Sequence, residues 1–279
     1  MKEYKNFFTI ILFISGIGLI MGTFLDFRIA EIIFNPNNKL CVFLEFAGYY
    51  PLYIPIPLLC SLIMIKNKNK LIKCFSYVIG GISLSVIIIC GIVFLKHRNV
   101  FIINYYLSIF ISIIASFALQ IVIYNSMKKL SENVRDKLFI ICLFGVLLII
   151  WKVIIISGLK ILMGRARYCN IINGDGYYTP WYIINRPRMG KSFPSGHVGG
   201  ACGILNILLV PILFKNTKKY KSLLEIIAAV YIIMLAFSRM VIGKHMLSDV
   251  SAAVFIMITG FMFLLNIFEK SKKLLVLRS

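Results

Sequence analysis

This 279-residue sequence has no long polar segment in which a soluble domain could fold. Its longest polar stretch is residues 160–197, whereas 60% of the chain is hydrophobic and the mean hydropathy is +0.90. A soluble domain of this length would be about 45–50% apolar. The excess falls in long runs with few charges, and about 18 such residues are enough for a helix to cross a bilayer. We therefore expect one membrane domain to account for nearly the whole chain.

Acidic residues are scarce, with 10 Asp and Glu against 31 Lys and Arg, so the formal net charge is +21. In a soluble protein this imbalance would suggest nucleic-acid binding. Here the basic residues gather in short loops between apolar runs, as in the cytoplasmic loops of membrane proteins. We therefore expect the bilayer and its anionic headgroups, and no nucleic acid, to be the partners of this charge.

Motifs for structural metals are also missing. The seven cysteines form no CxxC pair, and no Cys and His have the spacing of a zinc site. Five of the cysteines lie in apolar runs, namely Cys60, Cys74, Cys90, Cys142 and Cys202. The sequence therefore predicts no metal site.

Eight apolar runs can be counted, at about residues 7–25, 48–65, 74–95, 100–124, 138–159, 198–214, 223–241 and 250–268. They predict an all-α fold, a polytopic bundle of about eight transmembrane helices. The first run follows a basic N-terminus but has no small-x-small cleavage site, so we expect an uncleaved span. The second run contains Pro51, Pro55 and Pro57, and its end is expected to be kinked or partly unwound.

Loop charges predict the orientation. Basic clusters follow the second, fourth, sixth and eighth runs: Lys66, Lys68, Lys70 and Lys73; Lys128, Lys129, Arg135 and Lys137; Lys215, Lys218, Lys219 and Lys221; Lys270, Lys272, Lys273 and Arg278. With a cytoplasmic N-terminus, all of them fall on the cytoplasmic side, which is the positive-inside pattern. We therefore expect a multi-pass protein of the cell (plasma) membrane with both termini in the cytoplasm and residues 160–197 outside.

Three segments place charged residues against the ends of apolar runs on that outer side. They are Lys160–Arg167, Ser192–His197 and Ser238–Asp249. The orientation rests on loop charges alone, so the shared side independently supports one common site. A single Lys or Arg at a span end is usually a snorkelling anchor, and a lone His at a helix start is more often structural. The combination is what points to chemistry.

The residue types in these segments suit a phosphate-like ligand. Lys160, Arg167 and Arg239 can converge on one dianion, and the arginine fork matches phosphate oxygens. Ser195 is a plausible N-cap, and Gly196 lets backbone approach closely. The N–H groups at a helix N-terminus also suit an anion.

Two of the three histidines fall in the same segments. His245 and Asp249 are four residues apart, so they share a face if that stretch is helical. A carboxylate beside an imidazole fixes its tautomer and raises its basicity, which activates a nucleophile. His197 is then available as a general acid. Because cations can stabilise the transferring phosphoryl group, this chemistry requires no metal and no other cofactor.

The three segments resemble the signature of the type 2 phosphatidic acid phosphatase superfamily: Lys-x6-Arg-Pro, then Pro-Ser-Gly-His, then Ser-Arg-x5-His-x3-Asp. The chain matches it from about residue 157 to its end, with Lys160-x6-Arg167, Pro194-Ser195-Gly196-His197 and Ser238-Arg239-x5-His245-x3-Asp249. Tyr168 stands where the family usually has proline, a change that affects loop shape more than chemistry.

The resemblance implies a role for each matched residue. His245 would attack phosphorus and form a phosphohistidine, His197 would protonate the leaving group, and Asp249 would orient His245. The phosphate would be held by Lys160, Arg167, Ser195, Gly196 and Arg239. The resemblance also implies a helical bundle with a core of about six helices, in which residues 138–279 form the catalytic part and residues 1–137 a variable N-terminal part.

The expected function is a membrane lipid phosphatase that hydrolyses a lipid phosphomonoester or a prenyl diphosphate at the extracytoplasmic face. A lipid phosphotransferase would use the same site with a lipid acceptor. A transporter is disfavoured because charge inside the runs is nearly confined to Lys152. The related vanadium-dependent haloperoxidases are mostly soluble, and the eight apolar runs count against that reading. No motif identifies the lipid or the oligomeric state.

Overall fold

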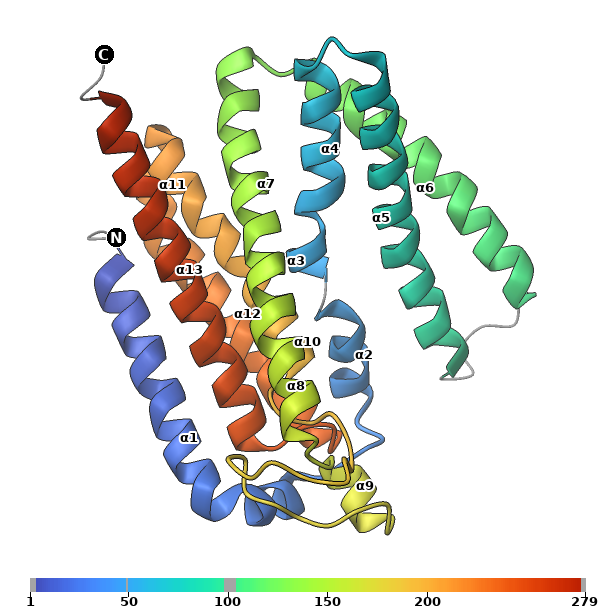
Figure 1. Cartoon of the computed structure of the whole chain (residues 1–279), viewed down its shortest axis with the longest axis vertical. Helices are drawn as coiled ribbons and strands as arrows, with labels where there is room; N and C mark the ends of the chain where they lie inside the picture. The colour runs from blue at the N-terminus through green and yellow to red at the C-terminus, as the bar shows by residue number, and fades with distance from the viewer. Residues whose placement is uncertain (1–3, 49, 98–103, 277–279) are drawn as a thin grey trace.

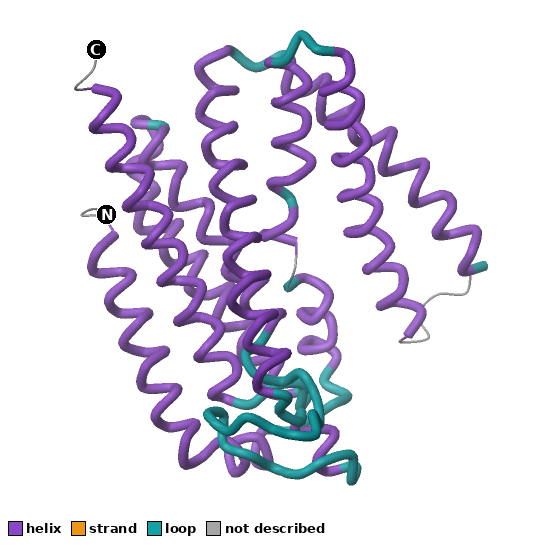
Figure 2. The backbone as a smooth tube through the Cα atoms, in the orientation of Figure 1, coloured by secondary structure: helices purple, strands orange, loops and turns teal. Residues whose placement is uncertain are grey.

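All regular structure described in this protein is helical (Figure 2). The structure is a computed structural model that describes residues 4–48, 50–97 and 104–276, and these ranges contain no strand. Parts of the sequence predictions lie outside the described residues: the basic N-terminal residues 1–3, the start of the fourth run at residues 100–103, and Arg278.

The longer helices are α1 (Lys5–Ile33), α4 (Pro55–Lys66), α5 (Lys70–His97), α6 (Tyr105–Lys128), α7 (Glu132–Lys152), α12 (Lys221–Val241) and α13 (Leu247–Val276). The shorter helices are α2 (Lys39–Ala47), α3 (Tyr50–Tyr53), α8 (Gly158–Met163), α9 (Tyr168–Ile172), α10 (Gly196–Ala201) and α11 (Leu209–Leu213). Between them lie the π-helical turn η2 (Val153–Ser157) and the 3-10 segments η3 (Cys202–Leu208) and η4 (Lys215–Tyr220).

Eight helical stretches within the described residues are long and apolar enough to cross a membrane. They are Lys5–Ile33, Lys39–Lys66, Lys70–Val93, Tyr105–Lys128, Glu132–Ile172, Gly196–Leu213, Lys215–Val241 and Leu247–Lys270. Each overlaps one of the predicted apolar runs. The prediction of an all-α, polytopic helical bundle is therefore confirmed, and the protein is a multi-pass membrane protein.

The second span is broken where its prolines lie, as predicted. It consists of α2, α3 and α4, and α4 begins at Pro55. Proline has no N–H to donate and is well tolerated in the first turn of a helix, where Pro55 and Pro57 lie. The break lets α2 run in a different direction from α4 (Figure 1).

The first helix belongs to the same bundle as the C-terminal half of the chain. In Figure 1, α1 lies along α13, with α7 and α12 beside them, while α5 and α6 form a hairpin against α4. One hydrophobic core joins α1, α7 and α13, in which the ring of Phe261 lies 5.5 Å from that of Phe8 and 4.8 Å from that of Phe144. A boundary at residue 137 stays a prediction, but the core extends across it.

Small residues allow α1 and α13 to approach closely. A Cβ added to Gly22 would lie 2.8 Å from Ser248 Cβ and 2.9 Å from the Ser248 backbone nitrogen. Gly18, one turn earlier, faces Ser251 in the same way. Helix pairs in membranes commonly use such small-xxx-small faces.

Gly22→Ala is expected to destabilise the protein by about 1–3 kcal/mol, because the added methyl group must push two packed backbones apart. Gly16→Ala is the matched control on the same helix, since no atom other than those of the neighbouring residues and helix backbone lies within 4 Å of the added carbon. We expect the control to leave stability unchanged or raise it slightly. Thermal unfolding in detergent measures both, and equal midpoints for the two variants would contradict the packing argument.

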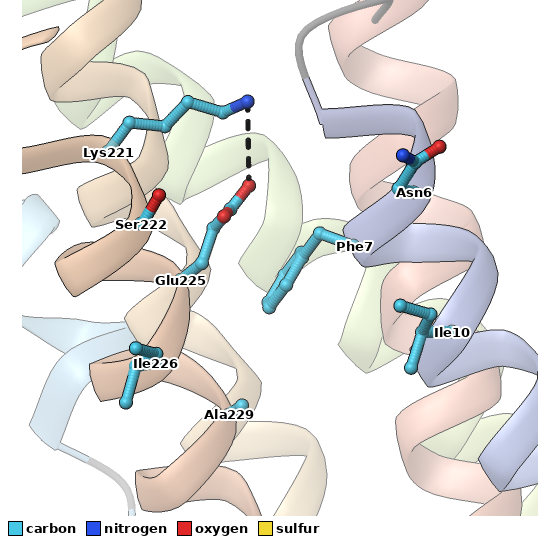
Figure 3. Close-up of a pocket in the computed structure, with 8 residues that line it drawn as sticks. All are labelled: Asn6, Phe7, Ile10, Lys221, Ser222, Glu225, Ile226 and Ala229. Carbon is cyan, nitrogen blue, oxygen red and sulfur yellow. Dashed lines mark ion pairs between the residues drawn. The ribbon is translucent and has the colours of Figure 1, made fainter.

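A cleft lies at the end of the bundle that holds the start of α1 and the start of α12 (Figure 3). It is lined by Asn6, Phe7, Ile10, Lys221, Ser222, Glu225, Ile226 and Ala229. The Lys221 ammonium lies 3.8 Å from a Glu225 carboxylate oxygen. The lining contains no histidine and no residue of the three motif segments, so the candidate site lies elsewhere.

Candidate active site

The three motif segments meet at the opposite end of the bundle, around the start of α13 (the lower end in Figure 1). From the first segment, Arg165 Nη1 donates to Asp249 Oδ1 over 2.8 Å. From the second, Ser192 Oγ donates to Asp249 Oδ2 over 2.5 Å, and the Ser195 backbone N–H donates to the Asp249 carbonyl over 2.9 Å. Asp249, in the third segment, therefore connects all three.

The first segment turns sharply at Gly164. This residue ends α8 in the left-handed region, with φ +57°, where a side chain would be strained and glycine is favoured. The chain then places Arg165 in the interior and leaves Arg167 half-buried at the start of α9. Lys160, in α8, donates from Nζ to the Lys191 carbonyl over 2.6 Å. The Arg167 Nε is buried and has no hydrogen-bond partner among the described residues. Buried donors are normally paired, so this N–H is available to donate to a bound ligand.

The second segment enters a helix at the predicted residue. Ser195 is the N-cap of α10, and its hydroxyl accepts from the Val198 backbone N–H over 3.4 Å. Gly196 is the first residue of the helix and is buried. His197 follows it, and the charges that act on its imidazole are those of Arg239, His245, Lys160 and Arg167. The cations that the sequence assigned to phosphate binding therefore all act electrostatically on His197.

The third segment differs from its prediction in one respect. His245 does not share a helix with Asp249, because it lies in the turn between α12 and α13. This turn is tight because Gly243 has φ +68° and because the N–H groups of Lys244 and His245 both donate to the Arg239 carbonyl, over 3.1 and 3.2 Å. The turn still brings the His245 Nδ1 to 3.6 Å from Asp249 Oδ2. The two side chains face each other although the condition of one continuous helix is not met.

The His245 imidazole is buried beside a buried carboxylate, with exposed fractions of 2% for His245 and 0% for Asp249. A distance of 3.6 Å is longer than a normal N–H···O bond, so the carboxylate faces the ring without a full hydrogen bond. Burial lowers the pKa of His245 to about 3; the Asp249 carboxylate opposes this shift, and the charges of Lys160 and Arg239 add to it. The imidazole is therefore neutral at physiological pH, as a nucleophile must be.

Arg239 reaches the site from the end of α12 and is only 2% exposed. Its Nη1 forms an ion pair with Glu45 Oε1 of α2 over 2.9 Å. A buried charge is costly unless it is paired, so Glu45 offsets part of the cost of holding Arg239 inside the bundle.

Several residues of the site were not predicted as site residues from the sequence. Arg165 lies in the first segment between two assigned cations, and Ser192 lies at the start of the second. Asp26 and Glu45 lie in the first two spans, far from the motifs in sequence. An ionisable residue within a membrane span is by default a functional candidate, and this rule could have identified Asp26.

The model of one family, described as the PAP2 superfamily, matches residues 138–273. This range contains all three motif segments but neither Asp26 nor Glu45. A comparison with curated proteins and one with solved structures find no match.

Proposed function

Since residues 138–273 of this chain belong to the PAP2 superfamily, which comprises phosphatase-type enzymes acting on lipid-like substrates, we propose that the protein is a membrane lipid phosphatase that works through a phosphohistidine on His245. The observation that carries the proposal is a neutral, buried His245 that faces the Asp249 carboxylate at the point where three motif segments meet. The substrate would be a lipid phosphomonoester or a prenyl diphosphate.

In the first step, the His245 Nε2 attacks phosphorus while the bond from phosphorus to the lipid oxygen breaks. His197 gives its proton to that oxygen, and the dephosphorylated lipid leaves. Asp249 faces the other ring nitrogen, Nδ1, and stabilises the positive charge that the ring gains. In the second step, water attacks the phosphohistidine, His197 takes a proton from that water, and inorganic phosphate leaves.

The negative charge on the transferring phosphoryl group would be stabilised by Lys160, Arg167 and Arg239, together with the N–H groups that follow the Ser195 cap. These donors are positioned before substrate binds, because Arg239 is held by Glu45 and Lys160 by a backbone carbonyl. A phosphate dianion among these cations also offsets the positive charge around His197, which helps that ring to carry the proton it must donate.

The site would open at the extracytoplasmic face of the plasma membrane, with both termini in the cytoplasm. The support for this orientation is the distribution of basic loops, which lie at the end of the bundle opposite the motif segments. A lipid phosphate could then reach the site from the outer leaflet, with its tail among the helices.

The direct test is inorganic phosphate release by the purified protein in detergent, with EDTA present because the proposed steps use no metal. The panel would contain phosphatidic acid, phosphatidylglycerophosphate, undecaprenyl diphosphate and lipid A. Release from at least one of them by the wild-type protein supports the phosphatase. No release from any, with a phosphorylated lipid appearing when a lipid alcohol is added, would instead indicate the phosphotransferase.

The pH dependence of kcat is expected to be bell-shaped, because in the enzyme–substrate complex His245 must be neutral and His197 must be protonated. Burial lowers the pKa of His245 from 6.5 to about 3, so protonation of this ring removes activity only when the pH falls towards 3. The acid limb that belongs to His245 should therefore lie well below pH 6.5. A rate that rises without a maximum into strong alkali would contradict these roles.

A further inference from the structure

A chain of buried charged side chains leads to the carboxylate that faces His245, the proposed nucleophile. It runs from Asp26 in α1, through Arg165 after α8, to Asp249 in α13. Arg165 Nη2 lies 2.9 Å from Asp26 Oδ2, and its Nη1 lies 2.8 Å from Asp249 Oδ1. None of the three residues is more than 1% exposed. One guanidinium thus bridges two carboxylates that are far apart in the sequence.

Arg165 has a partner for each of its nitrogens. Its Nε donates to the Thr179 carbonyl over 2.9 Å, and its Nη1 also donates to Ser248 Oγ over 2.8 Å. A planar guanidinium whose three nitrogens all donate hydrogen bonds can move little. A lysine ammonium at this position could not reproduce this geometry. The position of Asp249 Oδ1 is therefore set by Arg165, while Oδ2 is left for Ser192, the Met246 N–H and the facing His245.

Asp26 holds the same assembly from the side of the first helix. Its Oδ1 accepts from the Ser248 backbone N–H over 2.8 Å, and its Oδ2 accepts from the Ser248 hydroxyl. Ser248 lies in the first turn of α13 and immediately precedes Asp249. Asp26 thus satisfies a free N–H at the start of α13, as an N-cap does, although it comes from another helix.

Stability alone does not account for this arrangement. Replacing a buried ion pair with well-packed apolar residues is often neutral or stabilising, and charged residues inside membrane spans are rare and usually functional. Here the charges end at the carboxylate that faces the proposed nucleophile.

We propose that Asp26 and Arg165 are positioning residues of the active site, which act on His245 through Asp249. The inference rests on the proposed function of His245. It makes α1, which lies outside the family match, a required part of the catalytic apparatus. Asp26 and Arg165 touch neither substrate nor reacting atoms, so their removal should lower kcat and leave KM nearly unchanged.

The test compares Asp26→Asn with Glu31→Gln, an exposed acid on the same helix, for phosphate release in detergent. We expect Asp26→Asn to lower kcat by about 10–100-fold, the usual cost of removing a partner that orients a functional group. KM should stay within about threefold, and the Glu31→Gln variant should match the wild type. In an Asp249→Asn background, Asp26→Asn should lower kcat by less than about threefold further, because Asp26 acts on His245 only through the Asp249 carboxylate.

Two results would overturn the inference. One is an Asp26→Asn variant with wild-type kcat, and the other is an Asp26→Asn change that lowers kcat as much in the Asp249→Asn background as in the wild type. If Asp26→Asn does not fold, Ser248→Ala removes the hydroxyl that joins Asp26 to Arg165, and a wild-type kcat in that variant would likewise refute it. An inactive wild-type protein would refute the proposed function instead, and activity that survives in His245→Ala would remove the nucleophile on which both proposals rest.

Discussion

His245→Ala is expected to lower kcat for lipid phosphate hydrolysis by about 10⁶-fold, as the loss of a covalent nucleophile does in other enzymes. No other described side chain combines a neutral imidazole, burial and a facing carboxylate in this way. The measurement is steady-state phosphate release, together with trapping of the intermediate. Radiolabelled substrate quenched in alkali should leave label on the wild-type protein, at His245, and none on the variant.

Lys244→Ala is the matched control for this experiment. Lys244 precedes His245 in the same turn, and its backbone N–H donates to the same Arg239 carbonyl, a bond that alanine keeps. The control should retain both the label and turnover. Label that persists in the His245→Ala variant, on any residue, would assign the nucleophile elsewhere.

His197→Asn should have the second-largest effect, and its size should depend on the leaving group. A lipid alkoxide is a poor leaving group, so loss of the general acid should lower kcat/KM for the lipid substrate by about 10²–10⁴-fold. A nitrophenolate leaves without a proton, so kcat/KM for 4-nitrophenyl phosphate, which reports only the step that forms the phosphohistidine, should be lowered far less. Asparagine keeps a polar group of similar size at the second position of α10.

The ratio of the two losses is the informative quantity. His245→Ala removes a step common to both substrates, so it should abolish both hydrolyses equally. Equal losses of kcat/KM for both substrates in His197→Asn would mean that His197 binds phosphate and does not protonate the leaving group. The substitution leaves the Ser195 N-cap of α10 unchanged, so the variant should keep its helical structure, which circular dichroism can check.

The spans could be predicted from the sequence because an apolar run long enough to cross a bilayer leaves few alternatives to a helix. The break in the second span was also readable, since proline acts locally. The fifth span was predicted to end near residue 159, but helix continues through η2 and α8 to Met163. The predicted run stopped at the charge of Lys160. A lysine near the end of a span can nevertheless remain in the helix, with its aliphatic stem buried and its ammonium extended towards water.

The meeting of the three motif segments could be predicted in part for a different reason. Each motif is a short segment, and the structure brings the three together. Geometry that depends on a turn could not be predicted: the spacing of His245 and Asp249 gives one helix face only if the stretch is helical, and Gly243 turns the chain before α13 begins. Partners from distant helices could not be inferred at all, because nothing local in Asp26 or Glu45 indicates which arginine each will meet.

The bridge between Asp26 and its partners also orders events during biosynthesis. Asp26 enters the membrane with the first helix, while Arg165 follows 139 residues later and Ser248 follows 222 residues later. Until Arg165 is synthesised, the nascent chain holds a carboxylate with neither of these partners, at a real cost in a lipid environment. Until the last helix is inserted, that carboxylate still lacks Ser248. The contacts with Ser248 then favour docking of the final helix against the first, so assembly of the bundle and completion of the proposed active site become the same event.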